Sequence, residues 1–143
     1  MKARDLMTPN PRAVTGDTPV SEVAGLMRDL DVGIVPVVDD LAHMHPRGVI
    51  TDRDIVVRHV AERHPGECRV EDHMSGGHVD RVEPDADASE VMALMRRDQV
   101  RRILVVERGR LVGIIAQADL ALKEGRVEPL RVEEVLERVS SPG

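Results

Sequence analysis

The sequence contains no phenylalanine, tyrosine or tryptophan. Its core must therefore be built from Val, Ile, Leu, Met and Ala, which can still fill space at native density. The same absence removes the aromatic platforms on which single-stranded nucleic acids usually stack. The net charge of −6 also argues against a general polyanion binder. We therefore expect no nucleic-acid partner.

Other features that often reveal function are also scarce. Cys68 is the one cysteine, which excludes an internal disulfide and suits a reducing cytoplasm. No apolar run approaches the roughly 18 residues of a membrane span, and Met1–Asp5 does not resemble the start of a signal peptide. At 143 residues the chain is near the size of one domain. We expect a soluble cytoplasmic protein that does not contact the membrane.

The sequence does contain an internal repeat. Ser21–Arg28 (SEVAGLMR) returns as Ser89–Arg96 (SEVMALMR), and Gly48–Asp54 (GVITDRD) returns as Gly113–Asp119 (GIIAQAD) in the same order. The length difference between the copies falls around Leu41–Pro46, where a loop tolerates insertion. Two copies predict a duplicated supersecondary unit and a pseudo-two-fold pair rather than a longer solenoid.

Each copy is expected to contain a strand, a helix, two strands and a helix. In the first copy these are Arg12–Thr15, a helix from Pro19 capped by Thr18, strands Gly33–Val38 and Arg47–Thr51, and a helix over Asp52–Arg63. In the second they are a helix capped by Asp87 with Glu90 in a capping box, strands Arg102–Val106 and Leu111–Ala116, and a helix over Gln117–Glu124. We assign residues 3–63 to repeat 1, 64–74 to a linker, 75–123 to repeat 2, and 124–143 to a tail with a short amphipathic helix.

The turn from Thr51 to Asp54 has two interpretations. Thr-x-x-Asp is a common helix cap. It also places a hydroxyl, a carboxylate and the unpaired N–H groups of a helix start together, a combination that binds anions and ribose hydroxyls. The carboxylate recurs as Asp119 although Ala116 has lost the hydroxyl, which favours binding.

The repeated pattern resembles the CBS domain pair, or Bateman module. The motifs are Met7-Thr8-Pro9, Gly33–Val38 and Gly48–Asp54, and Gln99–Val106 is similar to small stand-alone bacterial CBS-pair proteins of the hypoxic-response type. The resemblance implies an α/β fold. It would be a tandem CBS-domain pair of two pseudo-two-fold-related β-α-β-β-α repeats packed sheet to sheet, with two related pockets for adenosine-type ligands in the cleft between them.

The resemblance also implies the ligand-binding residues. Asp54 and Asp119 correspond to the family's ribose-binding acid, and Thr51 to its phosphate-side hydroxyl. Adenine would be held by Val14, Thr15, Ile34, Val35 and Pro36 in the first copy and by Val82, Arg102, Ile103 and Leu104 in the second. The second copy departs from the family at Ala116 and Leu104, so its pocket matches less well.

Two other clusters carry charge or metal-ligating groups. We interpret Arg96 and Arg97 as a solvated face, whereas Arg101 and Arg102 remain candidates for phosphate contacts. The side chains of His43, His45, His64, Cys68, His73 and His78 lack the compact paired spacing of a zinc site, so we predict no metal.

The predicted function is regulatory. No Ser/His/Asp or Cys/His set recurs, so we expect no enzyme, catalytic residue or cofactor. The leading hypothesis is a sensor of AMP, ADP, ATP or an S-adenosylmethionine-like ligand that signals to an unidentified protein effector. The alternative is a ligand-free structural or stress-response homodimer. A homodimer is expected in both cases, with its interface on two helical stripes: Val20, Val23, Ala24 and Met27, and Ala88, Val91, Met92 and Met95.

Overall fold

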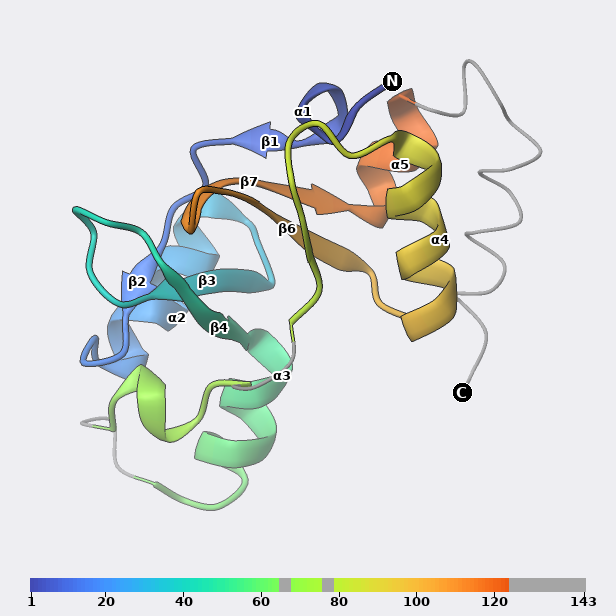
Figure 1. Cartoon of the computed structure of the whole chain (residues 1–143). Coiled ribbons are helices and arrows are strands. Elements are labelled where there is room, and N and C mark those ends of the chain that lie inside the picture. The colour runs from blue at the N-terminus through green and yellow to red at the C-terminus, as the bar shows by residue number, and fades with distance from the viewer. Residues whose placement is uncertain (65–67, 76–78, 124–143) are drawn as a thin grey trace. The chain divides into compact units, whose positions relative to one another are not determined.

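The chain folds as two units in a computed structural model that describes residues 1–64, 68–75 and 79–123 (Figure 1). Unit 2 is the continuous stretch Arg12–Val79. Unit 1 combines Met1–Pro11 with the chain from Asp80 onward. The first residues of the chain therefore belong with the second repeat. The predicted tail helix lies outside the described residues.

The described elements follow the predicted order within each repeat. Unit 2 contains β2 (Val14–Thr15), α2 (Val20–Leu30), β3 (Ile34–Val38), β4 (Pro46–Thr51), α3 (Asp52–Asp54), η1 (Ile55–Val60) and η2 (Val70–Asp72). Unit 1 contains α1 (Ala3–Leu6), β1 (Thr8–Pro9), β5 (Arg81–Val82), α4 (Ala88–Asp98), β6 (Arg102–Glu107), β7 (Arg110–Ala116) and α5 (Gln117–Lys123).

The two sheets have the same core topology. In unit 2, β2 runs parallel to β3, and β3 pairs with β4 as an antiparallel hairpin. In unit 1, β5 and β6 are parallel and β6 and β7 are antiparallel. Unit 1 gains one further strand, because β1 pairs antiparallel with β7 and places Thr8 opposite Ile114 (Figure 1). The predicted α/β repeat is confirmed.

In each unit a short helical segment, α1 or η2, forms backbone hydrogen bonds with the residues just before the long helix, α4 or α2. In unit 1 the Ala3 N–H donates to the Ala86 carbonyl at 2.8 Å. In unit 2 the Val70 N–H donates to the Thr18 carbonyl at 2.8 Å, and the Val20 N–H donates to the Cys68 carbonyl at 2.8 Å. The helix α1 precedes the first repeat but packs in unit 1, with the second repeat. The helix η2 precedes the second repeat but packs in unit 2, with the first.

Each unit has its own aliphatic core. Val23, Met27, Val35, Val37, Ile50 and Val70 form the core of unit 2, and a larger set that includes Leu6, Val91, Met92, Met95, Ile103 and Ile115 forms that of unit 1. The expectation that the two helical stripes form a dimer face is wrong. Seven of the eight stripe residues, Val20, Val23, Met27, Ala88, Val91, Met92 and Met95, are buried within their own chain, and Ala24 is exposed.

The helix starts differ in detail from the prediction. Pro19, not Thr18, occupies the N-cap position of α2. Asp87 does precede α4, but its side chain makes no capping bond. It accepts a hydrogen bond from Lys2 Nζ at 2.6 Å, and this contact lowers the pKa of Asp87. An ion pair to the chain start has replaced the predicted capping box.

The helix after β4 changes type along its length. It begins as α-helix at Asp52 and continues as a π-helix over η1. The wider turn is visible in the bond from the Ala61 N–H to the Val56 carbonyl at 2.8 Å. Among the described residues, no helix is both long and apolar enough to cross a membrane.

A pair of glycine substitutions tests the packing of β1 on β7. A Cβ at Gly113 would lie 2.9 Å from Met7 Cβ, so Gly113→Ala should lower the free energy of unfolding by about 1–3 kcal/mol. Gly25 lies within α2 with only an arginine side chain nearby. Gly25→Ala should therefore raise the free energy of unfolding by about 0.5–1 kcal/mol. Urea denaturation followed by circular dichroism measures both, and equal effects would contradict the packing.

Candidate functional site

The turn from β4 into α3 is a closed capping box. The Asp54 N–H donates to Thr51 Oγ1 at 3.0 Å, and the Thr51 N–H donates to Asp54 Oδ2 at 2.9 Å. Thr51 has an extended backbone and Asp54 a helical one, as this motif requires. The two predicted site residues therefore bind each other.

A second group of contacts surrounds the Asp54 carboxylate, which is 7% exposed. The Ser75 hydroxyl lies 3.1 Å from one of its oxygens and 3.2 Å from the other. Arg58 Nε lies 3.8 Å from Oδ1, one helical turn further along. These hydrogen bonds and the nearby guanidinium compensate the burial of the Asp54 carboxylate.

Unit 1 repeats this turn without the hydroxyl. The Ala116 N–H donates to Asp119 Oδ2 at 3.0 Å. The strand ends also match, since the Asp52 N–H donates to the Gly33 carbonyl at 2.9 Å and the Gln117 N–H to the Arg101 carbonyl at 2.8 Å. Because Asp119 caps its turn without a hydroxyl partner, capping alone is enough to explain why the carboxylate recurs.

The remaining predicted ligand residues separate into two groups within each unit. Ile34 lies opposite Thr51, and Arg102 lies opposite Ala116, so these residues stand at the carboxylate end of their strands. Val14 and Thr15 pair with Val37 and Val38 at the other end of β3, and Val82 pairs with Val105. The buried side chains of Val35, Pro36, Ile103 and Leu104 leave mainly their backbone for a ligand.

Two cavities occupy equivalent places in the repeats. One of about 390 Å³ is lined by Val14, Thr15 and Leu26 together with polar residues of α2, including Glu22. The other, of about 400 Å³, is lined by Val82, Glu90 and Leu94. Both lie between the short first strand and the first helix of a repeat. Neither of these two cavities is lined by Asp54 or Asp119.

The prediction of a solvated face holds for Arg97, whereas Arg96 is half-buried. Arg97 is exposed and its guanidinium binds Asp98, with Nε 2.9 Å from Oδ1. Arg101 and Arg102 are exposed at the strand end that precedes the Asp119 turn. Cationic side chains thus stand near the carboxylate of unit 1.

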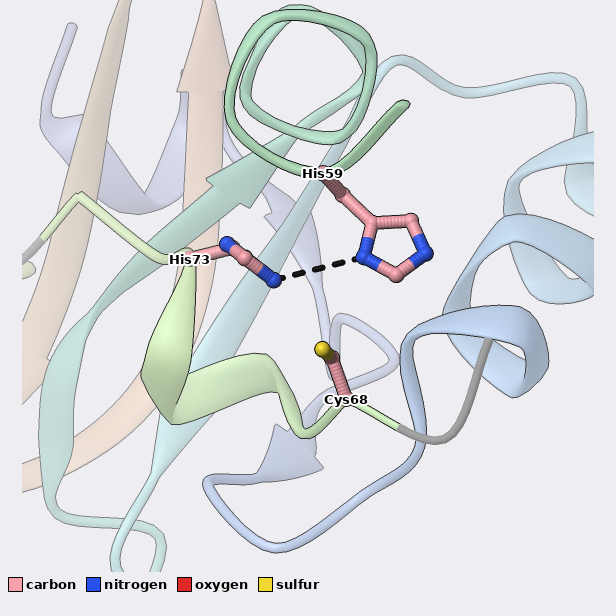
Figure 2. Close-up of side chains that lie close together, drawn as sticks. All are labelled: His59, Cys68 and His73. Carbon is pink, nitrogen blue, oxygen red and sulfur yellow. Dashed lines mark hydrogen bonds between the residues drawn. The ribbon is translucent and has the colours of Figure 1, made fainter. Parts of the chain in front are cut away.

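Sequence spacing did not reveal one cluster of metal-ligating side chains (Figure 2). His59 on η1, Cys68 before η2 and His73 after η2 bring their ligand atoms within 4.8 Å of one another. His59 Nδ1 lies 3.3 Å from His73 Nε2, and both rings are buried. Burial lowers the pKa of His73, and the neighbouring His59 and His64 lower it further. His59 escaped notice because it lies inside a predicted helix, although His64 follows it by five residues.

Comparison with known proteins identifies the family. Residues 3–60 and 70–124 each match the family described as CBS domain. The chain belongs to the CBS-domain family. It is a CBS-pair regulatory module, as the repeated motifs suggested.

Two curated relatives cover most of the chain. An uncharacterized protein of Bacillus subtilis, YlbB, is 40% identical over 86% of this chain and 82% of its own length. Hypoxic response protein 1 of Mycobacterium tuberculosis is 32% identical over 83% of this chain and 82% of its own.

Solved structures agree with the fold. A crystal structure of hypoxic response protein I, with two coordinated zinc ions, has a TM-score of 0.76 and 29% identity, and covers 86% of this chain and 98% of that one. A structure of CBSX2 in complex with AMP has a TM-score of 0.74 and 23% identity, and covers 89% of this chain and 98% of that one. At this lower identity the likeness to CBSX2 shows the fold alone.

The capping box makes a prediction about stability. Thr51→Val removes the acceptor for the Asp54 N–H while keeping the branched shape, and should lower the free energy of unfolding by about 1 kcal/mol. Thr51→Ser keeps the hydroxyl and should stay within about 0.5 kcal/mol of the parent. Urea titration of all three proteins decides the point, and equal losses in the two variants would show that the hydroxyl is not a cap.

Proposed function

We propose that this CBS-pair module is a non-catalytic sensor of an adenosine-type ligand, with AMP as the first candidate. The observation that supports this most directly is the half-buried Asp119 carboxylate, which lies at the strand end that also carries the exposed Arg101 and Arg102. Membership of the CBS-domain family supports the same chemistry, and CBSX2, which shares the fold, has been solved in complex with AMP. The signal would pass to a partner protein by contact.

Asp119 is the more accessible carboxylate. Its side chain is half-buried, and its described hydrogen bond comes from the Ala116 backbone, which leaves acceptor capacity for two ribose hydroxyls. The exposed Arg101 and Arg102 stand at the neighbouring strand end and suit a phosphate group. This arrangement favours an anionic nucleotide over an uncharged nucleoside.

Asp54 offers a more enclosed site. Its oxygens already accept hydrogen bonds from Thr51 and Ser75, so a ribose would have to replace the Ser75 hydroxyl. That exchange keeps the number of hydrogen bonds to the carboxylate while releasing the segment that carries Ser75. A ligand at Asp54 would therefore change the protein more than a ligand at Asp119.

Nucleotide binding can be tested by calorimetry, because the chain has no Trp or Tyr to report binding. We expect the parent protein to bind AMP. Asp54→Ala and Asp119→Ala should each lower the affinity for AMP at the site of the substitution by roughly ten- to a hundredfold, because charge-assisted hydrogen bonds are lost. Glu107→Gln, an exposed charge change at the β6 hairpin, should leave the affinity unchanged.

Two results would count against the proposal. One is unchanged affinity in both aspartate variants with the fold intact. The other is no heat and no thermal stabilisation with AMP, ADP, ATP or S-adenosylmethionine at millimolar concentration, which would favour the ligand-free structural or stress-response homodimer. Gly113→Ala, which disturbs the packing against Met7 and keeps both carboxylates, shows how much loss of stability alone affects binding.

We also propose that the module forms a homodimer through the two helices of the first repeat. Within unit 2, Leu30 of α2 and Val56, Val57 and Val60 of η1 are exposed, from 43% to 61%. Four exposed aliphatic side chains on two helices are more than the single exposed residues that monomers usually tolerate. A second copy with the same patch would bury them in a two-fold interface.

A matched pair of substitutions tests this interface. Val60 and Leu41 are each 61% exposed, one on η1 and the other in the β3–β4 loop. Val60→Glu should give a monomer of 15.8 kDa by light scattering, because a charge in the apolar interface is costly, whereas Leu41→Glu should remain a dimer. A parent protein that is monomeric at micromolar concentration would exclude the dimer.

A further inference from the structure

Unit 2 buries two imidazole rings in an edge-to-face arrangement beside a thiol, outside the carboxylate turns. His59 is 8% exposed and His73 is 4% exposed, with the Nδ1 of His59 directed at the Nε2 of His73 (Figure 2). Cys68 is half-buried and points into the same space. Buried polar groups normally have partners, and here each ring has the other and the sulfur as near neighbours.

The distances fit a tetrahedral metal. Zinc bound by two imidazoles at 2.0–2.1 Å holds its nitrogens about 3.3 Å apart, and a thiolate at 2.3 Å places sulfur about 3.6 Å from each. The two nitrogens here are 3.3 Å apart. The sulfur lies within 4.8 Å of both, so closing the site needs an approach of about 1.2 Å at most, within the range of a side-chain rotation.

We propose that His59, Cys68 and His73 bind one zinc ion. Two imidazoles and a thiolate are borderline to soft ligands, which select zinc over the oxygen-preferring magnesium and calcium. The cluster opens to a cavity of about 590 Å³ that also receives Glu62, His64 and Asp72. These side chains give the metal an entry path whose carboxylates attract a cation.

The same cavity supplies a fourth ligand. The ring centroid of His64 lies 5.0 Å from that of His73 and 6.3 Å from that of His59. His64 is exposed, so its ring is free to rotate toward the metal. A site with three histidines and one cysteine is closed, as structural zinc sites are.

Such an ion would add a bond between two segments that also meet through the aliphatic core and through hydrogen bonds. His59 belongs to the helix that carries Asp54, and Cys68 and His73 belong to the segment that ends in Ser75. Between them, Arg58 donates to the carbonyls of His73 and Met74 at 3.5 and 3.2 Å. Zinc would therefore hold the helix and the η2 segment together and stabilise unit 2.

The experiment is a metal titration of the full chain after removal of metals by a chelator, in the presence of a phosphine reductant. We expect one zinc per chain by competition with a chromophoric chelator, and a thiolate-to-cobalt absorption band when cobalt(II) replaces zinc. Cys68→Ser and His73→Gln should each weaken zinc binding by at least about a hundredfold, since even the loss of a ligand's supporting partner costs 10- to 100-fold. Zinc, but not magnesium, should raise the melting temperature of the parent protein.

The double variant His43→Ala/His45→Ala is the matched control. These two exposed histidines lie together in another loop of unit 2, with ring centroids 5.8 Å apart, and should not affect binding. Cys68→Ser replaces a half-buried residue at little cost to the fold, so its loss of the cobalt band reports coordination rather than unfolding. Absence of zinc binding by the parent, or undiminished binding by folded Cys68→Ser and His73→Gln, would overturn the proposal.

Discussion

The hydrogen bond that a backbone N–H donates to the carboxylate three residues later fixes the strand-to-helix turn in both units. Asp54 accepts this bond from Thr51, and Asp119 accepts it from Ala116. The bond satisfies a donor that the helix start would otherwise leave unpaired, and it sets the direction in which the helix leaves the sheet. The helix register, and with it the faces that are buried, follows from this turn. In unit 2 the hydroxyls of Thr51 and Ser75 add to it, which makes the first repeat the more tightly closed of the two.

Features with local causes followed from the sequence. The strands β3 and β6 are continuous aliphatic runs, and the helices α2 and α4 carry apolar residues at helical spacing, so the β-α-β-β-α order was predictable. The capping box at Thr51 was also predictable, because its two members lie three residues apart. The same local view misjudged the apolar stripes, since a helical stripe has the same spacing whether it faces its own core or a second chain. Burial of Val23 and Met95 settles that choice.

Features that depend on distant residues escaped sequence analysis. Nothing near Asp87 in the sequence indicates that its carboxylate will form an ion pair with Lys2. The two side chains meet only when the start of the chain packs on α4. The contact between His59 and His73 arises in the same way, through packing of the η2 segment on the helix after β4. The predicted ligand residues belong to several strands. Which of them lie at the same end of a sheet depends on the strand register, which the sequence alone does not give.

The π-helical stretch decides what the helix after β4 presents to its neighbour. Asp54 and His59 are five residues apart, a spacing that an α-helix turns well away from a common face. A turn widened to i→i+5 bonding brings such positions back into line, and both residues are indeed buried. A carboxylate and an imidazole thus share one surface of one helix. Restoring α-helical winding there would turn the two groups apart, so the winding itself couples the position of one to that of the other.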